Sequence, residues 1–142
     1  MILRDLLRAK GHTVISVRQG DAVMAAAQTM IDNNVGSAVV YDDAGTVVGL
    51  LSERDLVHGV ARCGANLNTL TVRDLMTTQV IHCGPHDEVN ATMSLMTNRR
   101  VRHLLVFDGE ALIGIISIGD LVKNRIDEIE TEAQHLREYI TA

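Results

Sequence analysis

Apolar residues in the first half of the chain follow two spacings, and each spacing predicts one kind of element. A short apolar run at Val14–Val17 predicts a strand. The apolar residues between Val23 and Ile31 recur about every 3.6 positions, which is typical of a helix with one buried face. Two further runs, Ser37–Tyr41 and Thr46–Leu51, flank an Asp- and Gly-containing turn and predict a hairpin. A second helix is expected to begin after Ser52.

The second half of the chain repeats this order. Val80–Cys83 predicts the strand, the apolar positions from Val89 to Met96 predict the helix, and His103–Phe107 with Ala111–Ser117 predict the hairpin. Another helix is expected after Ser117. Each half is therefore predicted to form a β-α-β-β-α unit.

Residue identities in the two halves indicate a true internal repeat. Gly49-Leu50-Leu51-Ser52 recurs as Gly114-Ile115-Ile116-Ser117, and Asp55-Leu56-Val57 recurs as Asp120-Leu121-Val122. One unit of about 50–60 residues buries too little apolar surface to be comfortably stable alone. We therefore expect an α+β fold in which two repeats are related by pseudo-twofold symmetry, with their sheets packed together and helices on the flanks.

The repeats leave a segment at each end of the chain and one between them. We predict a helix and linker over residues 1–13, the first repeat over 14–62, a linker over 63–79, the second repeat over 80–124 and a further helix over 125–142. Near the C-terminus the apolar residues are spaced alternately four and three positions apart, at Val122, Ile126, Ile129, Ala133, Leu136 and Ile140. This helix either packs back on its own domain or forms a dimer contact, and the spacing is equally consistent with both.

Composition narrows the class of protein. The 142 residues are 46% hydrophobic but only 2% aromatic, so the core must be built from aliphatic side chains. A formal charge of −5 without a basic run disfavours binding to nucleic acid, and no apolar run is long enough to span a membrane. The two cysteines, Cys63 and Cys83, form no recognisable disulfide framework, which fits a reducing compartment. We expect a soluble, cytoplasmic protein.

The repeated pattern of Gly, two apolar residues, Ser and an Asp three positions later resembles the signature of the CBS domain family. It runs from Gly49 to Asp55 and again from Gly114 to Asp120, in register within the repeats. The stretch Asp74-Leu75-Met76-Thr77 between the repeats also resembles the family. The chain is therefore similar to a tandem CBS domain pair, or Bateman module, of the stand-alone bacterial type.

This resemblance implies a regulatory function. Paired repeats of the family form a disc-like module with two clefts that bind AMP, ADP, ATP, S-adenosylmethionine or NAD, and such modules often form dimers and control an enzyme or transporter. We therefore expect an adenine-nucleotide sensor that acts in signal transduction as a homodimer on an unidentified partner protein, with no catalytic activity and no catalytic cofactor. The alternative is a dimerisation or protein-interaction module without a small ligand.

The Ser and Asp residues of the repeated motif are the first candidate ligand-binding residues. Ser52 and Ser117 each precede a predicted helix, where free backbone N–H groups attract anions, and Asp55 and Asp120 lie one turn further on. A carboxylate at that position can accept two hydrogen bonds from a ribose diol. The same Ser-x-x-Asp spacing is also a helix-capping box, so each motif taken alone has a purely structural explanation.

Basic residues supply candidate ligands for a phosphate. Arg100, Arg102 and His103 open a predicted strand of the second repeat, where the first repeat carries no charge. Alternation along a strand is expected to point Arg100 and Arg102 to one side and His103 to the other. Arg54 is a further candidate, and Gly119 at the equivalent position removes that charge from the second repeat. We expect two unequal clefts; the alternative role of the arginines is solvation or pairing with acids.

The first strand of each repeat is the place where the family resemblance implies contact with the adenine, and in the second repeat this strand includes Val80 and His82. His82, Cys83 and His86 also suggest a metal site. However, adjacent residues on a strand point to opposite faces, so His82 and Cys83 cannot easily share one ion. We therefore expect neither a metal site nor a catalytic residue.

Overall fold

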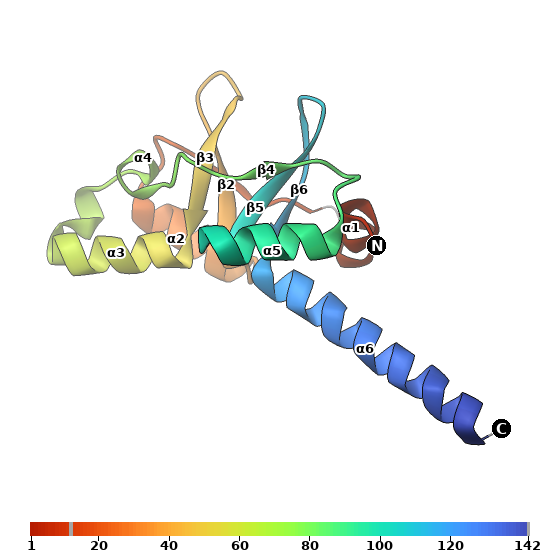
Figure 1. The fold of residues 1–142 in the computed structure, drawn as a ribbon. Coiled ribbons are helices and arrows are strands. Elements are labelled where there is room, and N and C mark those ends of the chain that lie inside the picture. The colour runs from red at the N-terminus through yellow and green to blue at the C-terminus, as the bar shows by residue number, and fades with distance from the viewer. Residues whose placement is uncertain (12, 142) are drawn as a thin grey trace. The chain divides into compact units, whose positions relative to one another are not determined.

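The computed structural model describes residues 1–11 and 13–141 of the chain. These residues divide into two compact units. Unit 1 contains residues 1–11 and 81–141, and unit 2 contains residues 13–80. The N-terminal segment thus belongs with the second repeat, whereas the repeat pattern in the sequence places it outside both repeats. Figure 1 shows the elements of each unit in chain order.

Unit 2 is built on a three-stranded sheet of order β1-β2-β3. β1 pairs with β2 in parallel and β2 pairs with β3 antiparallel, with Ser37 opposite Ser52. The elements of this unit are β1 (Ser16–Arg18), α2 (Val23–Asp32), β2 (Ser37–Tyr41), β3 (Val47–Ser52), α3 (Glu53–Cys63), the 3-10 helix η1 (Gly64–Thr69) and α4 (Val72–Leu75).

Unit 1 repeats this arrangement with a sheet of order β4-β5-β6. β4 pairs with β5 in parallel, β5 pairs with β6 antiparallel, and His103 lies opposite Ser117. Its elements are α1 (Leu3–Lys10), β4 (His82–Cys83), α5 (Val89–Arg99), β5 (His103–Asp108), β6 (Ala111–Ser117) and α6 (Ile118–Thr141).

The predicted β-α-β-β-α repeats and the predicted fold class are confirmed, with differences at the ends of some elements. The first strands are shorter than predicted and begin at Ser16 and His82, because pairing with the neighbouring strand begins only there. Ile31, predicted on the buried face of α2, is 73% exposed. The predicted boundary between residues 124 and 125 falls inside α6, which is one continuous helix.

Both cores are aliphatic, as the composition predicts. The two cores are filled by Leu, Val, Ile, Met and Ala side chains, and no aromatic residue is among the buried hydrophobic residues of the described chain. In unit 1 the core joins α1, α5, the two hairpin strands and the start of α6 through Leu7, Met96, Leu104, Ile116 and Leu121. In unit 2 it joins α2, the strands and α4.

α1 and α4 occupy equivalent positions on the two units. The first two residues of each helix donate backbone hydrogen bonds of 2.9 Å to the turn before the repeat's first helix. In unit 1, Leu3 N donates to the carbonyl of Asp87 and Arg4 N to that of Pro85. In unit 2, Val72 N donates to the carbonyl of Asp21 and Arg73 N to that of Gln19. The helix that precedes the first repeat in the sequence therefore packs on the second repeat, and the helix between the repeats packs on the first.

The glycine of each repeated motif makes this packing possible. A Cβ atom on Gly49 would lie 2.5 Å from the backbone oxygen of Thr77, and one on Gly114 would lie 2.5 Å from Leu7 Cδ2. Thr77 is held there by two hydrogen bonds of 2.9 Å with the backbone of Leu50. The motif needs glycine at its first position because the segment after α4, or the side of α1, lies directly against the strand.

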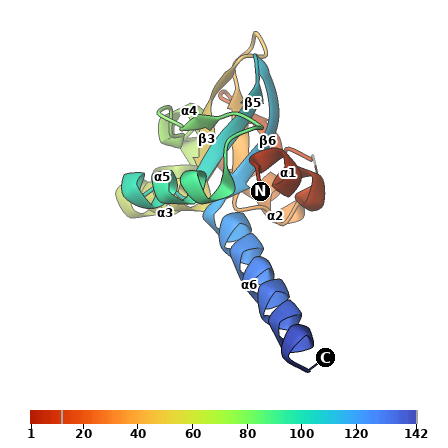
Figure 2. The ribbon, with the colours of Figure 1, turned by 45° about the vertical axis from the view of Figure 1, so that its right-hand side comes forward.

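α6 leaves the body of unit 1 after its first turns. Leu121 is fully buried, whereas Ile126 is 49% exposed, Leu136 is 62% exposed and Ile140 is 79% exposed. Both views show the helix extending away from the rest of its unit (Figures 1 and 2). Of the two alternatives for the C-terminal seam, packing back on its own domain is therefore wrong for this structure.

Candidate functional site

The N-terminus of α3 carries the Ser and Asp of the first repeat. Ser52 ends β3 in an extended conformation and Asp55 lies at the third position of the helix. Asp55 Oδ2 accepts hydrogen bonds from Ser52 N at 2.9 Å and Ser52 Oγ at 3.1 Å, and Asp55 N donates to Ser52 Oγ at 3.3 Å. The strand-to-helix turn is thus closed on both sides, and the carboxylate is held in one orientation.

A threonine from the segment after α4 completes the surroundings of Asp55. Thr77 Oγ1 donates to Asp55 Oδ1 over 3.0 Å. Since Oδ2 already accepts two hydrogen bonds, three of the roughly four acceptor sites of this carboxylate are used within the protein. A ribose diol at Asp55 would have to displace the Thr77 hydroxyl in order to make two hydrogen bonds.

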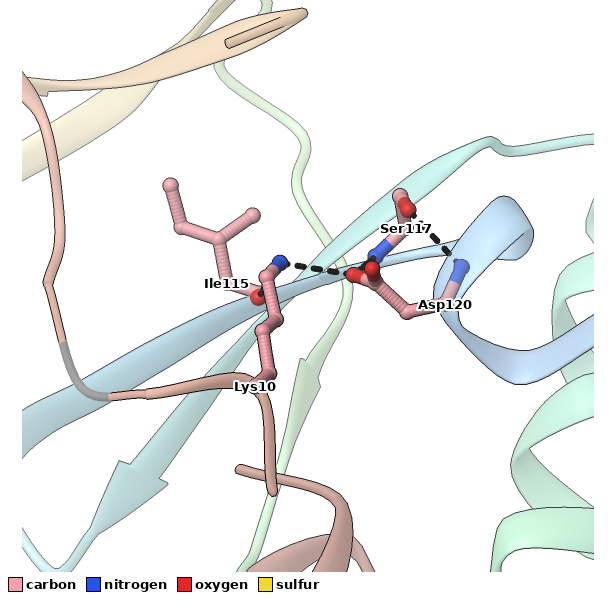
Figure 3. A network of polar contacts seen from close by, with 4 residues as sticks. All are labelled: Lys10, Ile115, Ser117 and Asp120. Atoms are coloured by element: carbon pink, nitrogen blue, oxygen red, sulfur yellow. Dashed lines mark hydrogen bonds and ion pairs between the residues drawn. The ribbon is translucent and has the colours of Figure 1, made fainter. Parts of the chain in front are cut away.

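The N-terminus of α6 repeats this geometry with a different partner. Ser117 N donates to Asp120 Oδ2 over 2.9 Å, and Asp120 N donates to Ser117 Oγ over 3.1 Å. The third group is Lys10, from the last turn of α1, whose Nζ lies 2.6 Å from Asp120 Oδ2 and 2.9 Å from the carbonyl oxygen of Ile115 (Figure 3). Both of these bonds to the carboxylate, from Ser117 N and from Lys10 Nζ, end on Oδ2.

Electrostatics around Asp120 favour its charged form. Burial raises the pKa of a carboxyl group, but the hydrogen bonds from Lys10 and from the Ser117 backbone, together with the charge of Lys10, outweigh it. The pKa of Asp120 is therefore lowered from its ordinary value. At neutral pH this site presents a charged carboxylate beside an ammonium group.

The capping role of the Ser-x-x-Asp motif is confirmed, and the same device occurs where no ligand is expected. Thr71 and Asp74 form a capping box at the start of α4, with Asp74 Oδ2 2.8 Å from Thr71 N and 3.2 Å from Thr71 Oγ1. Capping alone therefore explains the spacing. What distinguishes Asp55 and Asp120 from Asp74 is that they are partly buried and bonded to a second segment of chain, whereas Asp74 is exposed.

Of the three predicted basic residues of the second repeat, Arg102 and His103 lie next to the start of α6, and Arg100 does not. Arg102 is exposed, its carbonyl accepts a hydrogen bond of 2.8 Å from Ile118 N, and His103 lies opposite Ser117 in the hairpin. The expectation that Arg100 and Arg102 share one side of a strand is wrong. Arg100 caps α5 in the left-handed conformation, with φ 54°, and β5 begins only at His103.

The other candidates are spread over both units. Arg54 is exposed on the first turn of α3, next to the acidic Glu53, whose place in the second repeat is taken by Ile118. His82 is exposed on β4 and stacks on Phe107, with ring centroids 4.7 Å apart. In the sheet His82 lies opposite Leu105, and its ring packs against Phe107, so the ring is directed toward the end of β5 that is farther from His103 and Ser117. Val80 precedes β4 and belongs to unit 2.

Two other features of the described chain bear on the chemistry. Unit 2 has a hollow of about 570 Å³ next to the turn of its hairpin, lined by Arg18, Asp21, Tyr41 and Asp42 among others. It lies at the far end of β2 from Ser52, and its acidic lining does not suit a phosphate. Across residues 1–11 and 13–141, no three His, Cys, Asp or Glu side chains are grouped so as to hold a metal ion.

Sequence reasoning missed the two residues that complete the site. Thr77 lies in a stretch that the sequence singles out, but nothing in it indicates a contact with Asp55. Lys10 is 110 positions from Asp120, and the two residues meet because α1, which precedes the first repeat in the sequence, packs on the second repeat. The only available signal is the similarity of Arg4-Asp5-Leu6-Leu7 to Arg73-Asp74-Leu75-Met76, which marks α1 and α4 as equivalent.

Comparison with known proteins identifies the family. The CBS domain model matches residues 3–62 and 72–127, so one match begins with α1 and the other with α4. The chain belongs to the CBS domain family. It is 31% identical over 146 residues to the mitochondrial CBS domain-containing protein CBSX3 of Arabidopsis thaliana, covering 97% of this chain and 71% of that protein.

Solved structures of CBS proteins have the same fold. The CBS-domain containing protein ATU1752 from Agrobacterium tumefaciens is 40% identical with a TM-score of 0.84, covering 87% of this chain and 92% of that one. A putative signal-transduction protein with CBS domains from Burkholderia ambifaria is 35% identical with a TM-score of 0.83, covering 89% and 95%. As for membranes, the described part of this CBS pair contains no helix with the length and hydrophobicity needed to cross one.

Proposed function

We propose that this CBS pair is a non-catalytic regulatory module that binds an adenine nucleotide through the Ser and Asp of its repeats and transmits occupancy to a partner protein. The observation that carries the proposal is a partly buried, oriented carboxylate beside a serine at a helix N-terminus, built the same way in both units. The carboxylate suits a ribose diol, and the helix N-terminus suits a phosphate. A cytoplasmic location remains a prediction.

Comparison with a CBS pair of known ligands supports the adenosine part of this proposal. The CBS domain pair of protein MJ0100, 21% identical with a TM-score of 0.78, forms a complex with 5′-methylthioadenosine and S-adenosyl-L-methionine. Those ligands share the ribose and adenine of AMP, ATP and NAD but carry no phosphate. The basic residues of this chain therefore decide whether its ligand has one.

The second repeat is, in this proposal, the stronger site. Lys10 and the backbone of Ser117 both donate to Asp120 Oδ2, whereas Asp55 accepts on both oxygens, with Thr77 bonded to Oδ1. Lys10 bonds to Asp120, and Arg102 and His103 adjoin the start of α6 through their backbone, whereas at the start of α3 the charge of Arg54 is offset by that of Glu53. A ribose phosphate should occupy the second repeat first.

The decisive experiment removes each carboxylate and uses the third capping box as a control. Binding of AMP, ADP, ATP, NAD, NADH and S-adenosylmethionine is measured by calorimetry for the parent chain and for Asp55→Ala, Asp120→Ala and Asp74→Ala. We expect Asp120→Ala to weaken binding most, Asp55→Ala to weaken it less, and Asp74→Ala to lose helix stability of about 1 kcal/mol without loss of affinity. Unchanged affinity in an Asp55→Ala/Asp120→Ala variant that folds would refute the proposal.

The role of Arg102 is tested by comparing a phosphorylated and an unphosphorylated ligand. Arg102→Gln should weaken binding of AMP while leaving binding of 5′-methylthioadenosine unchanged. Arg99→Gln, which removes an exposed arginine at the end of α5, is the matched control and should change neither. Equal loss for both ligands would show that Arg102 supports the fold of the site and does not bind phosphate.

A second candidate function is favoured by α6 alone. A helix with a regular exposed apolar seam fits an interaction module that needs no small ligand. Absence of binding for all six compounds, together with a dimer that is lost on truncation after Asn124, would favour this alternative. Nucleotide binding that survives the same truncation would favour the sensor.

A further inference from the structure

The C-terminal part of α6 exposes an apolar seam that its own unit does not cover. Its members recur at spacings of four and three and, apart from the smaller Ala133, they are 44% to 79% exposed: Val122, Ile126, Ile129, Leu136 and Ile140. Only the first turn of the helix, through Leu121, contributes to the core of unit 1. The seam is about 27 Å long at 1.5 Å per residue.

A projecting helix of this length needs a partner. Isolated helices shorter than about 12–15 residues are marginal in water, and longer ones gain most of their stability from packing of an apolar face. The segment from Ile126 to Thr141 is only slightly longer than this limit and has its apolar face in solvent. A second helix packed along the seam would bury that face and stabilise the segment.

The pattern of charges beside the seam selects the partner and its direction. Placing Ile126, Ala133 and Ile140 at a positions puts Val122, Ile129 and Leu136 at d positions. The e positions are then Lys123, Glu130 and Arg137, and the g positions are Arg125, Glu132 and Tyr139. We infer that α6 pairs with α6 of a second copy of this chain as a parallel, in-register, two-stranded coiled coil.

Complementary charges meet in the parallel arrangement. In a parallel coiled coil each g residue faces the e residue five positions further along the partner helix. Arg125 then faces Glu130 of the second copy, and Glu132 faces Arg137 of the second copy. In the parent chain Arg125 forms an exposed pair with Glu128 over 3.2 Å, so it is already extended along the helix surface.

The same charges oppose the antiparallel arrangement. There e positions face e positions and g positions face g positions, so full overlap of the seams would place Glu130 against Glu130 and Glu132 against Glu132. Lys123 would also face Arg137. Three of the four flanking contacts would thus join like charges, which disfavours antiparallel pairing.

This coiled coil does not depend on nucleotide binding, and the first test measures assembly alone. Analytical ultracentrifugation of the parent chain, over a wide range of concentration and without nucleotide, should show a monomer–dimer equilibrium. Ile129→Glu, at a d position, should weaken dimerisation at least about 100-fold. Thr131→Glu adds the same charge two residues away at an f position and should leave the dimer intact. A monomeric parent, or an unaffected Ile129→Glu dimer, would overturn the inference.

The direction of the helices is tested by exchanging one pair of charges. Glu130→Arg places like charges opposite Arg125 in the parallel arrangement and should weaken the dimer, and Arg125→Glu/Glu130→Arg should restore it. In the antiparallel arrangement position 130 faces itself, so neither variant would differ from the parent. Equal dimerisation of all three proteins would therefore overturn the parallel orientation. Circular dichroism should show that any loss of helix in the weakened dimer is confined to the size of the C-terminal segment, because these side chains lie outside the core.

Discussion

The ion pair between Lys10 and Asp120 allows a quantitative test of the second site. Its atoms are 2.6 Å apart, but the side chains are 38% and 26% exposed, so water screens the attraction. An exposed or partly exposed pair of this kind contributes about 0.5–1 kcal/mol. Lys10→Met keeps the aliphatic stem and removes the ammonium group. We expect it to lower the free energy of unfolding at neutral pH by that amount, or the melting temperature by about 2–4 °C.

The pH dependence of this loss has a definite sign. The pKa of Asp120 is lowered in the folded protein, so its contribution to stability is present above the unfolded value of about 3.9 and disappears as the pH falls through the folded value. Without Lys10, only the bonds from Ser117 oppose the upward effect of burial on the pKa of Asp120, so this pKa rises. The difference in stability between parent and variant should therefore be full at neutral pH and shrink steadily in acid.

A double-mutant cycle isolates the pair. Chemical unfolding is measured for the parent, Lys10→Met, Asp120→Asn and the double variant, at low salt and at several pH values. Arg4→Met is the control, because Arg4 also joins α1 to its unit, through Asp108 at 3.2 Å, without touching Asp120. It should show no coupling to Asp120→Asn. A coupling energy of zero between Lys10 and Asp120, or a difference that grows in acid, would refute the electrostatic reasoning.

Three further predictions concern the backbone and the partly buried thiol of Cys83. Gly49→Ala, whose Cβ would press against a backbone carbonyl, should destabilise unit 2 by about 2–3 kcal/mol in urea unfolding. Gly114→Ala meets the buried side chain of Leu7, which can shift only by repacking the core, and should cost unit 1 about 1–2 kcal/mol. Arg100→Asn should stabilise the fold by up to about 1 kcal/mol, because asparagine tolerates the left-handed conformation better. Burial and the neighbouring Asp87 raise the pKa of the Cys83 thiol, so its alkylation should have a midpoint above the ordinary value, and Asp87→Asn should move that midpoint down.

The repeat made most of the fold predictable from the sequence. Gly49 to Asp55 and Gly114 to Asp120 occur once in each half, and the spacing around them defines a strand, a tight junction and a helix. The hairpin strands Ser37–Tyr41 and Ala111–Ser117 match their predicted bounds because apolar runs and turn residues are local signals. The family follows from the same motif.

The surroundings of the site could not be predicted, because they depend on contacts between distant segments. Periodicity identifies α1 as a helix but contains no information about which repeat it packs on. The sequence places Arg100 on a strand because no Gly or Pro separates it from the apolar run that follows, yet α5 extends to Arg99 and Arg100 is its C-cap. The exposure of the seam on α6 was equally undetermined, since an apolar face is required both for packing back and for pairing with another chain.

The packing of α1 on the second repeat and of α4 on the first explains why two similar repeats have different sites. Each Asp receives its third partner from the segment that follows one of these helices or ends it, and these segments have diverged more than the motif itself. Thr77 occupies an acceptor site on Asp55 Oδ1 with a neutral hydroxyl, while Lys10 brings a positive charge to Asp120 Oδ2. A change in the N-terminal helix therefore alters the second repeat without changing its motif, and variation at Lys10 should shift ligand preference at Asp120 while leaving Asp55 unaffected.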